Sequence, residues 1–438
     1  IKDEAVDPEF GTGAMTITPW HDATDFEIAE RHTLDKEQII DQHGNLLSIA
    51  GEFEGMPIEE VRQKVVDKLD KKGLLVSTDE NYSHNVAVNS RGRGIIEPQI
   101  MLQWFIDVNK PVVDWNGKDM SLKQVMRAVV EESQIEIIPK RFEKVYYHWI
   151  NNLHDWCISR QIWWGHRIPV WYKGEEMHVG IEAPTQDGDW EQDPDTLDAW
   201  FSSALWTWRK LIDSDQALDP KKSLSDILKH SPDFQRYHPT TVLETGYDIL
   251  FFWVARMILS TTYVVGDVPF KQVYLHGMVR TREGSKMSKS KPETTIDPLE
   301  IIPEFGADAL RLAMTLGMTP GSDTRLYKEK IAGYRNFCNK LWNVSRYVMS
   351  QIQPDYTPSS PRFETATEQW ILSRLNETIN TVSEQIEAYR FSDAGQAVYQ
   401  FLWNDFADWY LETHKIQPNI DVLIYILETT LKLAHPFA

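Results

Sequence analysis

Cysteine is scarce in this chain, which has only Cys157 and Cys338 among its 438 residues. Two cysteines cannot build the disulfide framework of a small secreted protein, and they suit a reducing cytosol. Long apolar runs are also lacking, because the richest stretch, residues 249–265, is interrupted by Arg256 and by threonines. A membrane span needs about 18 or more consecutive apolar residues. The first residues carry no signal-peptide pattern either. We therefore expect a cytoplasmic protein with no membrane partner.

Positive charge is in deficit. There are 45 basic and 65 acidic residues, which give a formal net charge of −20. This balance argues mildly against a nucleic-acid partner, but binding to phosphate depends on local basic patches. One such patch lies between residues 280 and 291 and comprises Arg280, Arg282, Lys286, Lys289 and Lys291. Taken alone, a cluster of this kind is more often a solvated charged face than a binding site.

The distribution of strand and helix patterns along the chain predicts three domains, 1–95, 96–325 and 326–438. Hydrophobic content of 42% indicates a folded protein long enough for several cores. The first part contains a helix that opens at Pro57 and stops at Gly73, together with strand-like residues 14–18 and 86–88.

The middle part alternates strands with helices, as a parallel sheet does. Predicted strands cover 135–138, 241–243 and 273–276, and predicted helices start at Arg141 and Asp248. The last part shows only helical periodicity, over residues 328–351, 365–388, 392–414 and 421–433. The fold class is therefore α/β followed by an α-helical bundle.

The strongest chemical signal is Lys286-Met287-Ser288-Lys289-Ser290, which follows a predicted strand. Two lysines three residues apart can neutralise the charge that develops on the β- and γ-phosphates of ATP as pyrophosphate leaves. This pentapeptide resembles the KMSKS loop of the class I aminoacyl-tRNA synthetases. Members of that family activate an amino acid with Mg-ATP and transfer it to the 3′ end of a tRNA.

Further motifs extend the resemblance over nearly the whole chain and narrow it to the valine-specific branch of the family. They lie at residues 6–14, 155–161, 163–169, 197–206, 244–253 and 333–343. The resemblance implies that 1–95 ends a β-rich editing domain, 96–325 is the second half of the Rossmann catalytic domain, and 326–438 is a helical anticodon-binding domain. The isoleucine enzymes have an acidic residue where this chain has Thr245, which favours valine.

The resemblance also implies roles for particular residues. Lys286 and Lys289 are the expected catalytic groups. The ATP-binding residues it implies are Gly246, Asp248, Met287, Ser288 and Lys289. It places Trp200, Trp253 and Thr245 in the amino-acid pocket, and Asp25, His21 and Asp22 in editing of mischarged threonine. For Asp22 and Asp25 the alternative is capping of a helix through Phe26, Ile28 and Ala29.

The expected partners are valine, ATP with its Mg²⁺, and tRNA(Val), and the expected state is a monomer. No structural zinc is expected, because Asn89 and Gly92 stand where many relatives have a cysteine pair and residues 173–193 contain no cysteine.

The His-Ile-Gly-His type motif of the family does not occur in the sequence. We therefore expect a fragment, without the first Rossmann half and the C-terminal end, that is inactive alone. Two alternatives stay open at this point. One is a non-catalytic tRNA-binding protein derived from a synthetase, and the other is a sister synthetase for isoleucine.

Overall fold

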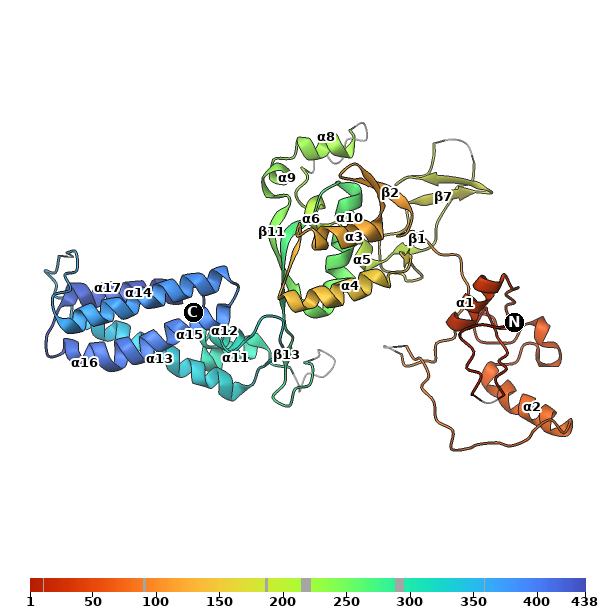
Figure 1. Ribbon diagram of the computed structural model, residues 1–438, viewed down its shortest axis with the longest axis horizontal. Coiled ribbons are helices and arrows are strands. Elements are labelled where there is room, and N and C mark those ends of the chain that lie inside the picture. The colour runs from red at the N-terminus through yellow and green to blue at the C-terminus, as the bar shows by residue number, and fades with distance from the viewer. Residues whose placement is uncertain (11, 90–91, 186–187, 214–221, 288–294, 358) are drawn as a thin grey trace. The chain divides into compact units, whose positions relative to one another are not determined.

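The computed structural model describes residues 1–10, 12–89, 92–185, 188–213, 222–287, 295–357 and 359–438. These residues form two compact units, Ile1–Trp104 and Phe105–Ala438 (Figure 1). No helix among them is both long enough and apolar enough to cross a bilayer.

The first unit is built from helices and turns. Its helical elements are α1 (Ala23–His32), η1 (Ser48–Phe53) and α2 (Ile58–Lys71). The helix predicted from Pro57 is therefore confirmed. The predicted strands at 14–18 and 86–88 were wrong as regular strands, since 86–88 contributes one isolated bridge, Val88 to Ile95, and 14–18 is irregular. A strand needs a neighbour along its length to pair its backbone groups, and the described part of this unit supplies none.

A parallel sheet organises the first part of the second unit. Its order is β11 (Thr240–Gly246), β12 (Phe270–His276) and β4 (Glu136–Ile138). Parallel neighbours need a crossover connection, and α10 (Arg256–Val264) lies in the one between β11 and β12. The alternating pattern of the sequence thus predicted the right sheet.

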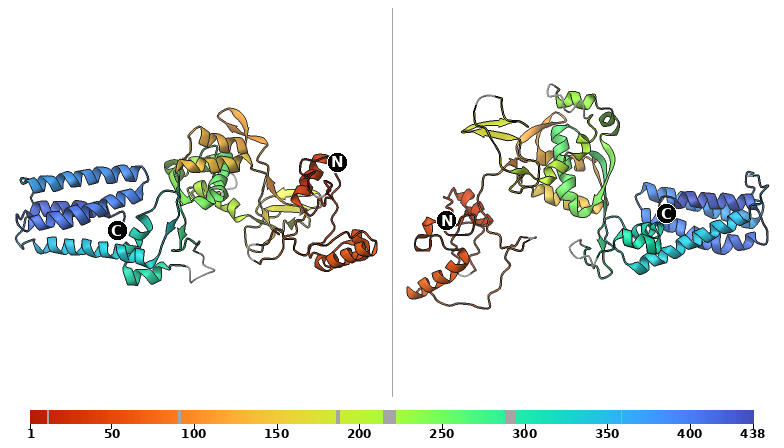
Figure 2. Two further views of the ribbon diagram at one scale, coloured as in Figure 1. Left: turned by 60° about the horizontal axis from the view of Figure 1, so that its bottom comes forward. Right: turned by 180° about the vertical axis from the view of Figure 1, so that it is seen from behind.

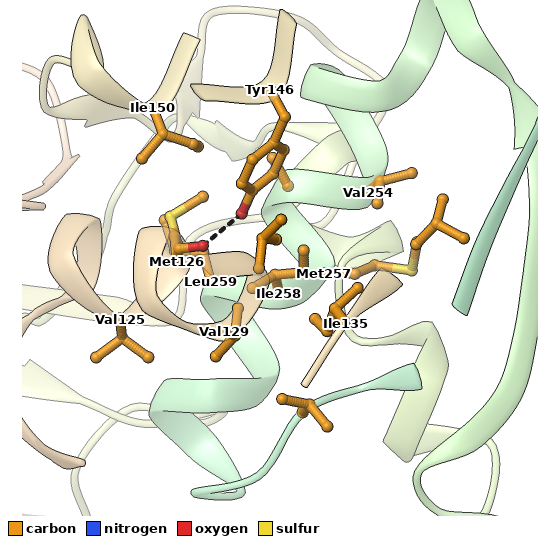
Figure 3. Close-up of a cluster of buried hydrophobic side chains, with 14 of the residues drawn as sticks. Val125, Met126, Val129, Ile135, Tyr146, Ile150, Val254, Met257, Ile258 and Leu259 are labelled. Atoms are coloured by element: carbon orange, nitrogen blue, oxygen red, sulfur yellow. Dashed lines mark hydrogen bonds between the residues drawn. The ribbon is translucent and has the colours of Figure 1, made fainter. Parts of the chain in front are cut away.

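The core of this part lies where α10 packs against α3 (Leu122–Glu131) and α4 (Glu143–Asn151) (Figure 3). Tyr146 is almost fully buried there, and its hydroxyl donates to the carbonyl of Met126 at 2.8 Å. Met257 and Ile258 are fully buried beside it. This core gives the sheet a rigid backing.

The same unit contains several small antiparallel sheets. They are β2 (Pro111–Trp115) with β3 (Lys118–Ser121), β1 (Phe105–Ile106) with β5 (Trp156–Cys157), β6 (Ser159–Arg160) with β10 (Thr196–Leu197), and β7 (Val170–Lys173) between β8 (Glu176–Val179) and β9 (Glu191–Gln192). Strands β13 (Val279–Arg280) and β14 (Thr324–Arg325) pair in parallel. Short helices complete this part, namely η2 (Lys140–Phe142), α5 (Ala199–Ser203), α6 (Trp206–Arg209), α8 (Leu224–Lys229), α9 (Pro232–Tyr237), η3 (Tyr247–Ile249), η4 (Leu250–Ala255), α11 (Pro298–Phe305) and α12 (Ala307–Thr315).

Long helices run side by side after α12 (Figure 2). They are α13 (Lys328–Ser350), α14 (Ala366–Glu387), α15 (Phe391–Gln400) continued by η6 (Phe401–Tyr410) and α16 (Leu411–His414), and α17 (Ile420–Ala434). All four predicted helical stretches are confirmed. Helix α14 starts at a capping box, in which the Thr365 hydroxyl accepts from the Glu368 amide and the Glu368 carboxylate accepts from the Thr365 amide.

Candidate active site

The carboxyl end of β11 brings the predicted nucleoside-binding residues together. Gly246 pairs in register with His276 at the end of β12, and Asp248 follows in η3. A Cβ on residue 246 would lie 2.7 Å from the Asp248 carboxylate, so only glycine leaves that oxygen its place. Thr245 is buried in the strand just before this turn. Ligands of open parallel sheets bind at this edge, beyond the carboxyl ends of the strands.

The predicted catalytic lysine reaches the same edge. The Lys286 ammonium lies 3.7 Å from the Asp248 carboxylate, and both side chains are exposed. The chain turns between Thr281 and Ser285 to bring Lys286 back beside Arg280. An exposed pair of this kind contributes about 0–1 kcal/mol to stability, so the lysine can exchange its partner for a phosphate.

The other residues predicted in this loop divide into two groups. Met287 packs against the apolar cluster under α11 and α12. Ser288 and Lys289 lie outside the described residues.

A cavity of about 540 Å³ lies beside Trp253, one of the two tryptophans predicted to wall the amino-acid pocket. The indole N–H of Trp253 donates to the Ser203 carbonyl at 3.2 Å, which fixes the ring against α5. Trp200 does not line this cavity. Its ring stacks on Phe252 instead, with centroids 6.1 Å apart. Thr245 is not part of the lining either. The structure therefore brings Trp253 to the cavity and Trp200 to its neighbourhood.

A partly buried ion cluster lies next to Trp200, and the sequence did not single it out. The Asp198 carboxylate accepts from Arg160 at 2.9 Å and pairs with Arg256 at 3.5 Å. It also accepts from the Trp200 amide at 3.1 Å, so it caps α5. Burial lowers the pKa of Arg256, and the nearby carboxylate opposes this shift. The sequence feature that could have indicated this cluster is the presence of charged residues inside aromatic-rich motifs. Such residues are seldom buried without a partner.

Models of known families match most of this chain. The model described as tRNA synthetases class I (I, L, M and V) matches residues 15–186 and 181–327. The model described as anticodon-binding domain of tRNA ligase matches residues 368–438. The first of these matches covers well over half of the chain.

The chain belongs to the class I tRNA synthetases.

Curated relatives of this synthetase chain are valine–tRNA ligases. Those of Halalkalibacterium halodurans and Geobacillus kaustophilus are 41% and 42% identical over the whole chain. The chain spans 48% of the length of each.

Solved structures share the fold of the synthetase chain. A ternary complex of Agrobacterium radiobacter LeuRS with tRNA and LeuAMS has a TM-score of 0.53 at 18% identity, covering 99% of this chain and 47% of that one. Mycobacterium tuberculosis methionyl-tRNA synthetase with methionyl-adenylate has a TM-score of 0.59 at 17% identity, covering 80% of this chain and 64% of that one. The predicted fold class is thereby confirmed.

In the first unit of the synthetase chain, each of the three predicted editing residues makes local hydrogen bonds. Asp22 is the N-cap of α1 and accepts from the amides of Thr24 and Asp25, as the capping alternative predicted. His21 Nε2 accepts from the Ile39 amide at 2.9 Å, so Nδ1 carries the proton and donates to the Pro98 carbonyl at 3.2 Å.

Asp25 lies in the first turn of α1 and is half-buried. Its carboxylate accepts from the Thr18 amide at 2.7 Å. Editing by these residues stays a prediction. Among the described residues, no three His, Cys, Asp or Glu side chains gather as metal ligands would.

Proposed function

We propose that this chain is the part of a valine–tRNA ligase that holds the KMSKS loop and the nucleoside-binding turn. The observation that carries the proposal is the meeting of Gly246, Asp248 and Lys286 at the carboxyl edge of a parallel sheet. Identity of 41–42% to valine–tRNA ligases along the whole chain supports valine as the amino acid.

The reaction starts with attack of the valine carboxylate on the α-phosphorus of ATP, which releases pyrophosphate and leaves valyl-adenylate. Gly246 and Asp248 hold the adenosine, because a close backbone approach and one carboxylate suit the base and the ribose hydroxyls. Lys286 and Lys289 stabilise the charge of the departing pyrophosphate. Mg²⁺ enters with ATP and neutralises its phosphates. The tRNA 3′ end then takes the valyl group from the adenylate.

The amino-acid pocket uses apolar aromatic walls in this proposal. Trp253 contacts the branched side chain, while Trp200 and Thr245 shape the pocket from behind. A pocket of this kind cannot strongly reject threonine, which is nearly isosteric with valine. Hydrolytic editing at a second site removes the mischarged product, and Asp25, half-buried in the first turn of α1, binds its ammonium group there.

The domain roles follow from the same proposal. Residues 1–95 end the editing domain, 96–325 form the second catalytic half, and the bundle 326–438 binds the anticodon region of tRNA(Val). The match of 368–438 to an anticodon-binding domain supports the last assignment. We propose a cytoplasmic monomer without structural zinc.

The test is amino-acid-dependent exchange of pyrophosphate into ATP, with the polypeptide expressed from its full natural reading frame. Valine should support fast exchange, threonine slower exchange and isoleucine little. Lys289→Ala should abolish the exchange. A folded protein that shows no exchange with any of the three amino acids would overturn the proposal and favour a non-catalytic tRNA-binding protein.

A further inference from the structure

A single carboxylate ties together two segments that are far apart in the sequence. One oxygen of Asp323 accepts from the Tyr247 hydroxyl at 2.9 Å and from the Met278 amide at 2.8 Å. The other oxygen accepts from the Arg280 guanidinium. Tyr247 stands between Gly246 and Asp248, whereas Arg280 ends β13 and leads into the loop of Lys286.

The Arg280 side chain also contacts the loop that contains Lys286. Its Nη1 donates to the Gly284 carbonyl at 3.2 Å, and its backbone forms an antiparallel bridge with Lys286. Asp323, Arg280 and Gly284 therefore form a continuous chain of polar contacts. With the Tyr247 contact, this chain runs from the neighbour of Asp248 to a residue two before Lys286.

The carboxylate is held in its ionised form. Partial burial raises the pKa of Asp323, but the hydrogen bonds from Met278, Arg280 and Tyr247 outweigh this effect and lower it. Side-chain exposure is 24% for Asp323 and 31% for Arg280, so water competes only in part for these contacts.

The turn that carries Asp323 is fixed from both sides. A Cβ on residue 277 would fall 1.8 Å from the Ser322 carbonyl oxygen, so the two backbones touch at Gly277. On the other side, Arg141 donates to the Pro320 carbonyl at 2.9 Å and to the Ser322 hydroxyl at 3.2 Å. Arg141 thus ties this turn to the segment of β4 and η2, while Thr324, next to Asp323, pairs with Val279 of β13.

We propose that Asp323 is a positioning residue for adenylate formation, which sets the nucleoside-binding turn and the Lys286 loop at a fixed distance from each other. This role rests on the proposed function. In the described part of the chain, the Asp323 carboxylate bonds to Tyr247, Met278 and Arg280 and not to Gly246, Asp248 or Lys286, so it acts through Tyr247 and Arg280. Its effect should fall on the step in which charge moves to the pyrophosphate, because a misplacement of about 1 Å is costly there.

The experiment compares Asp323→Asn and Tyr247→Phe with a matched control, Glu329→Gln, in the polypeptide from the full natural reading frame. Glu329 pairs with Arg282 of the same loop at 3.3 Å, but that pair is exposed on the surface. We expect Asp323→Asn to lower kcat for pyrophosphate exchange about tenfold or more, with the KM for valine within twofold of the parent. Tyr247→Phe should show the same pattern with a smaller loss.

Hydrogen exchange of the backbone amides in residues 279–287 gives a second readout that does not require activity. Asp323→Asn should speed exchange in this segment about tenfold and leave α13 unchanged, whereas Glu329→Gln should change neither. Equal kinetics and equal exchange for Asp323→Asn and Glu329→Gln would overturn the proposal. So would a rise in the KM for valine that matches the loss of kcat, since general loosening of the fold would then explain both.

The two proposals fail in different ways. If the parent protein shows no pyrophosphate exchange, the proposed function fails and the catalytic role of Asp323 falls with it. If the parent is active and Asp323→Asn behaves as the parent does, only the positioning role is overturned.

Discussion

The guanidinium of Arg256 lies over the ring of Trp156, with its central carbon 4.1 Å from the ring centroid. The same group is 3.5 Å from the Asp198 carboxylate, which is itself 5% exposed and caps the helix of Trp200. A planar cation can stack on an aromatic ring and face a carboxylate at its edge, and a lysine ammonium cannot do both. The cluster thus links α5, which carries Trp200, to α10 and the core beneath it.

Arg256→Met should destabilise the protein by about 3 kcal/mol, because it leaves a buried carboxylate with one partner fewer. Arg256→Lys should cost about 1–2 kcal/mol through the lost stacking. Urea unfolding at pH 7.5 measures both values. The control is Arg236→Lys, since Arg236 also lies over an aromatic ring, that of Tyr237, but at an exposed position. Equal costs for Arg256→Lys and Arg236→Lys would show that the ion cluster does not matter.

Gly277→Ala should damage the site without touching a charged group. The added methyl would overlap the Ser322 carbonyl oxygen, so the turn that carries Asp323 must move. We expect a loss of stability of at least about 2 kcal/mol together with slower pyrophosphate exchange. Gly333→Ala is the control, because nothing lies within 4 Å of its Cβ position in α13 and alanine favours helix. The free energy of unfolding of the Gly333→Ala variant should rise slightly or stay the same. A large loss of stability in that variant would contradict this explanation.

Lys286→Gln should separate catalysis from stability. The Lys286–Asp248 pair is exposed, so its removal should change the free energy of unfolding by less than about 1 kcal/mol. Exchange of pyrophosphate should fall about a hundredfold, as expected when one preorganised donor to a developing anion is removed. Lys328→Gln breaks a comparable exposed pair with Glu304 and should leave exchange unchanged. An equal loss in both variants would contradict a catalytic role for Lys286.

His414 should make the helical bundle sensitive to acid. Its side chain is 3% exposed, and burial lowers its pKa despite opposing effects of the Asn419 backbone and the Glu368 carboxylate. In the unfolded chain the imidazole takes up a proton as the pH falls through about 6.5, while in the bundle it stays neutral until a lower pH. The contribution of His414 to the stability of the bundle is therefore fully present above about pH 6.5. As the pH falls below this value, the free energy of unfolding decreases by up to about 1.4 kcal/mol per pH unit.

Unfolding in urea, followed by circular dichroism at pH 7.5 and pH 5.5, measures this effect. His414→Gln should lose less stability between the two pH values than the parent does. His435→Gln, at an exposed position near the C-terminus, should behave as the parent. If His414→Gln and the parent lose the same stability, other groups explain the acid sensitivity.

Local sequence pattern predicted those helices and strands that bury one face. The apolar periodicity of residues 328–351 and 421–433 correctly predicted α13 and α17. The strands predicted before Arg141 and Asp248 correspond to β4 and β11. The residues at 14–18 share the composition of a strand but lack a partner in the described part of their unit, and composition alone cannot show this.

Local sequence pattern predicts the contacts of the site only within a single motif, whereas the proximity of Lys286 and Asp248 was an expectation from the family resemblance. Gly246 and Asp248 are two residues apart, so their proximity follows from the motif itself. The pairs Tyr247–Asp323 and Arg160–Asp198 join segments 76 and 38 residues apart in the sequence. Such contacts depend on how the sheet and its loops close, which no local period encodes. Trp200 illustrates the same limit, because its motif gave no indication that its ring would stack on Phe252.

The order of the parallel sheet bears on how this chain will behave at high concentration. Among the described residues, β11 is bonded to a strand on one side only, that of β12. A row of unpaired amide and carbonyl groups along an exposed strand is a template onto which another chain can add. Strand β4 is the other edge of this sheet, but it has three residues against seven in β11, so self-association of the chain should begin along β11.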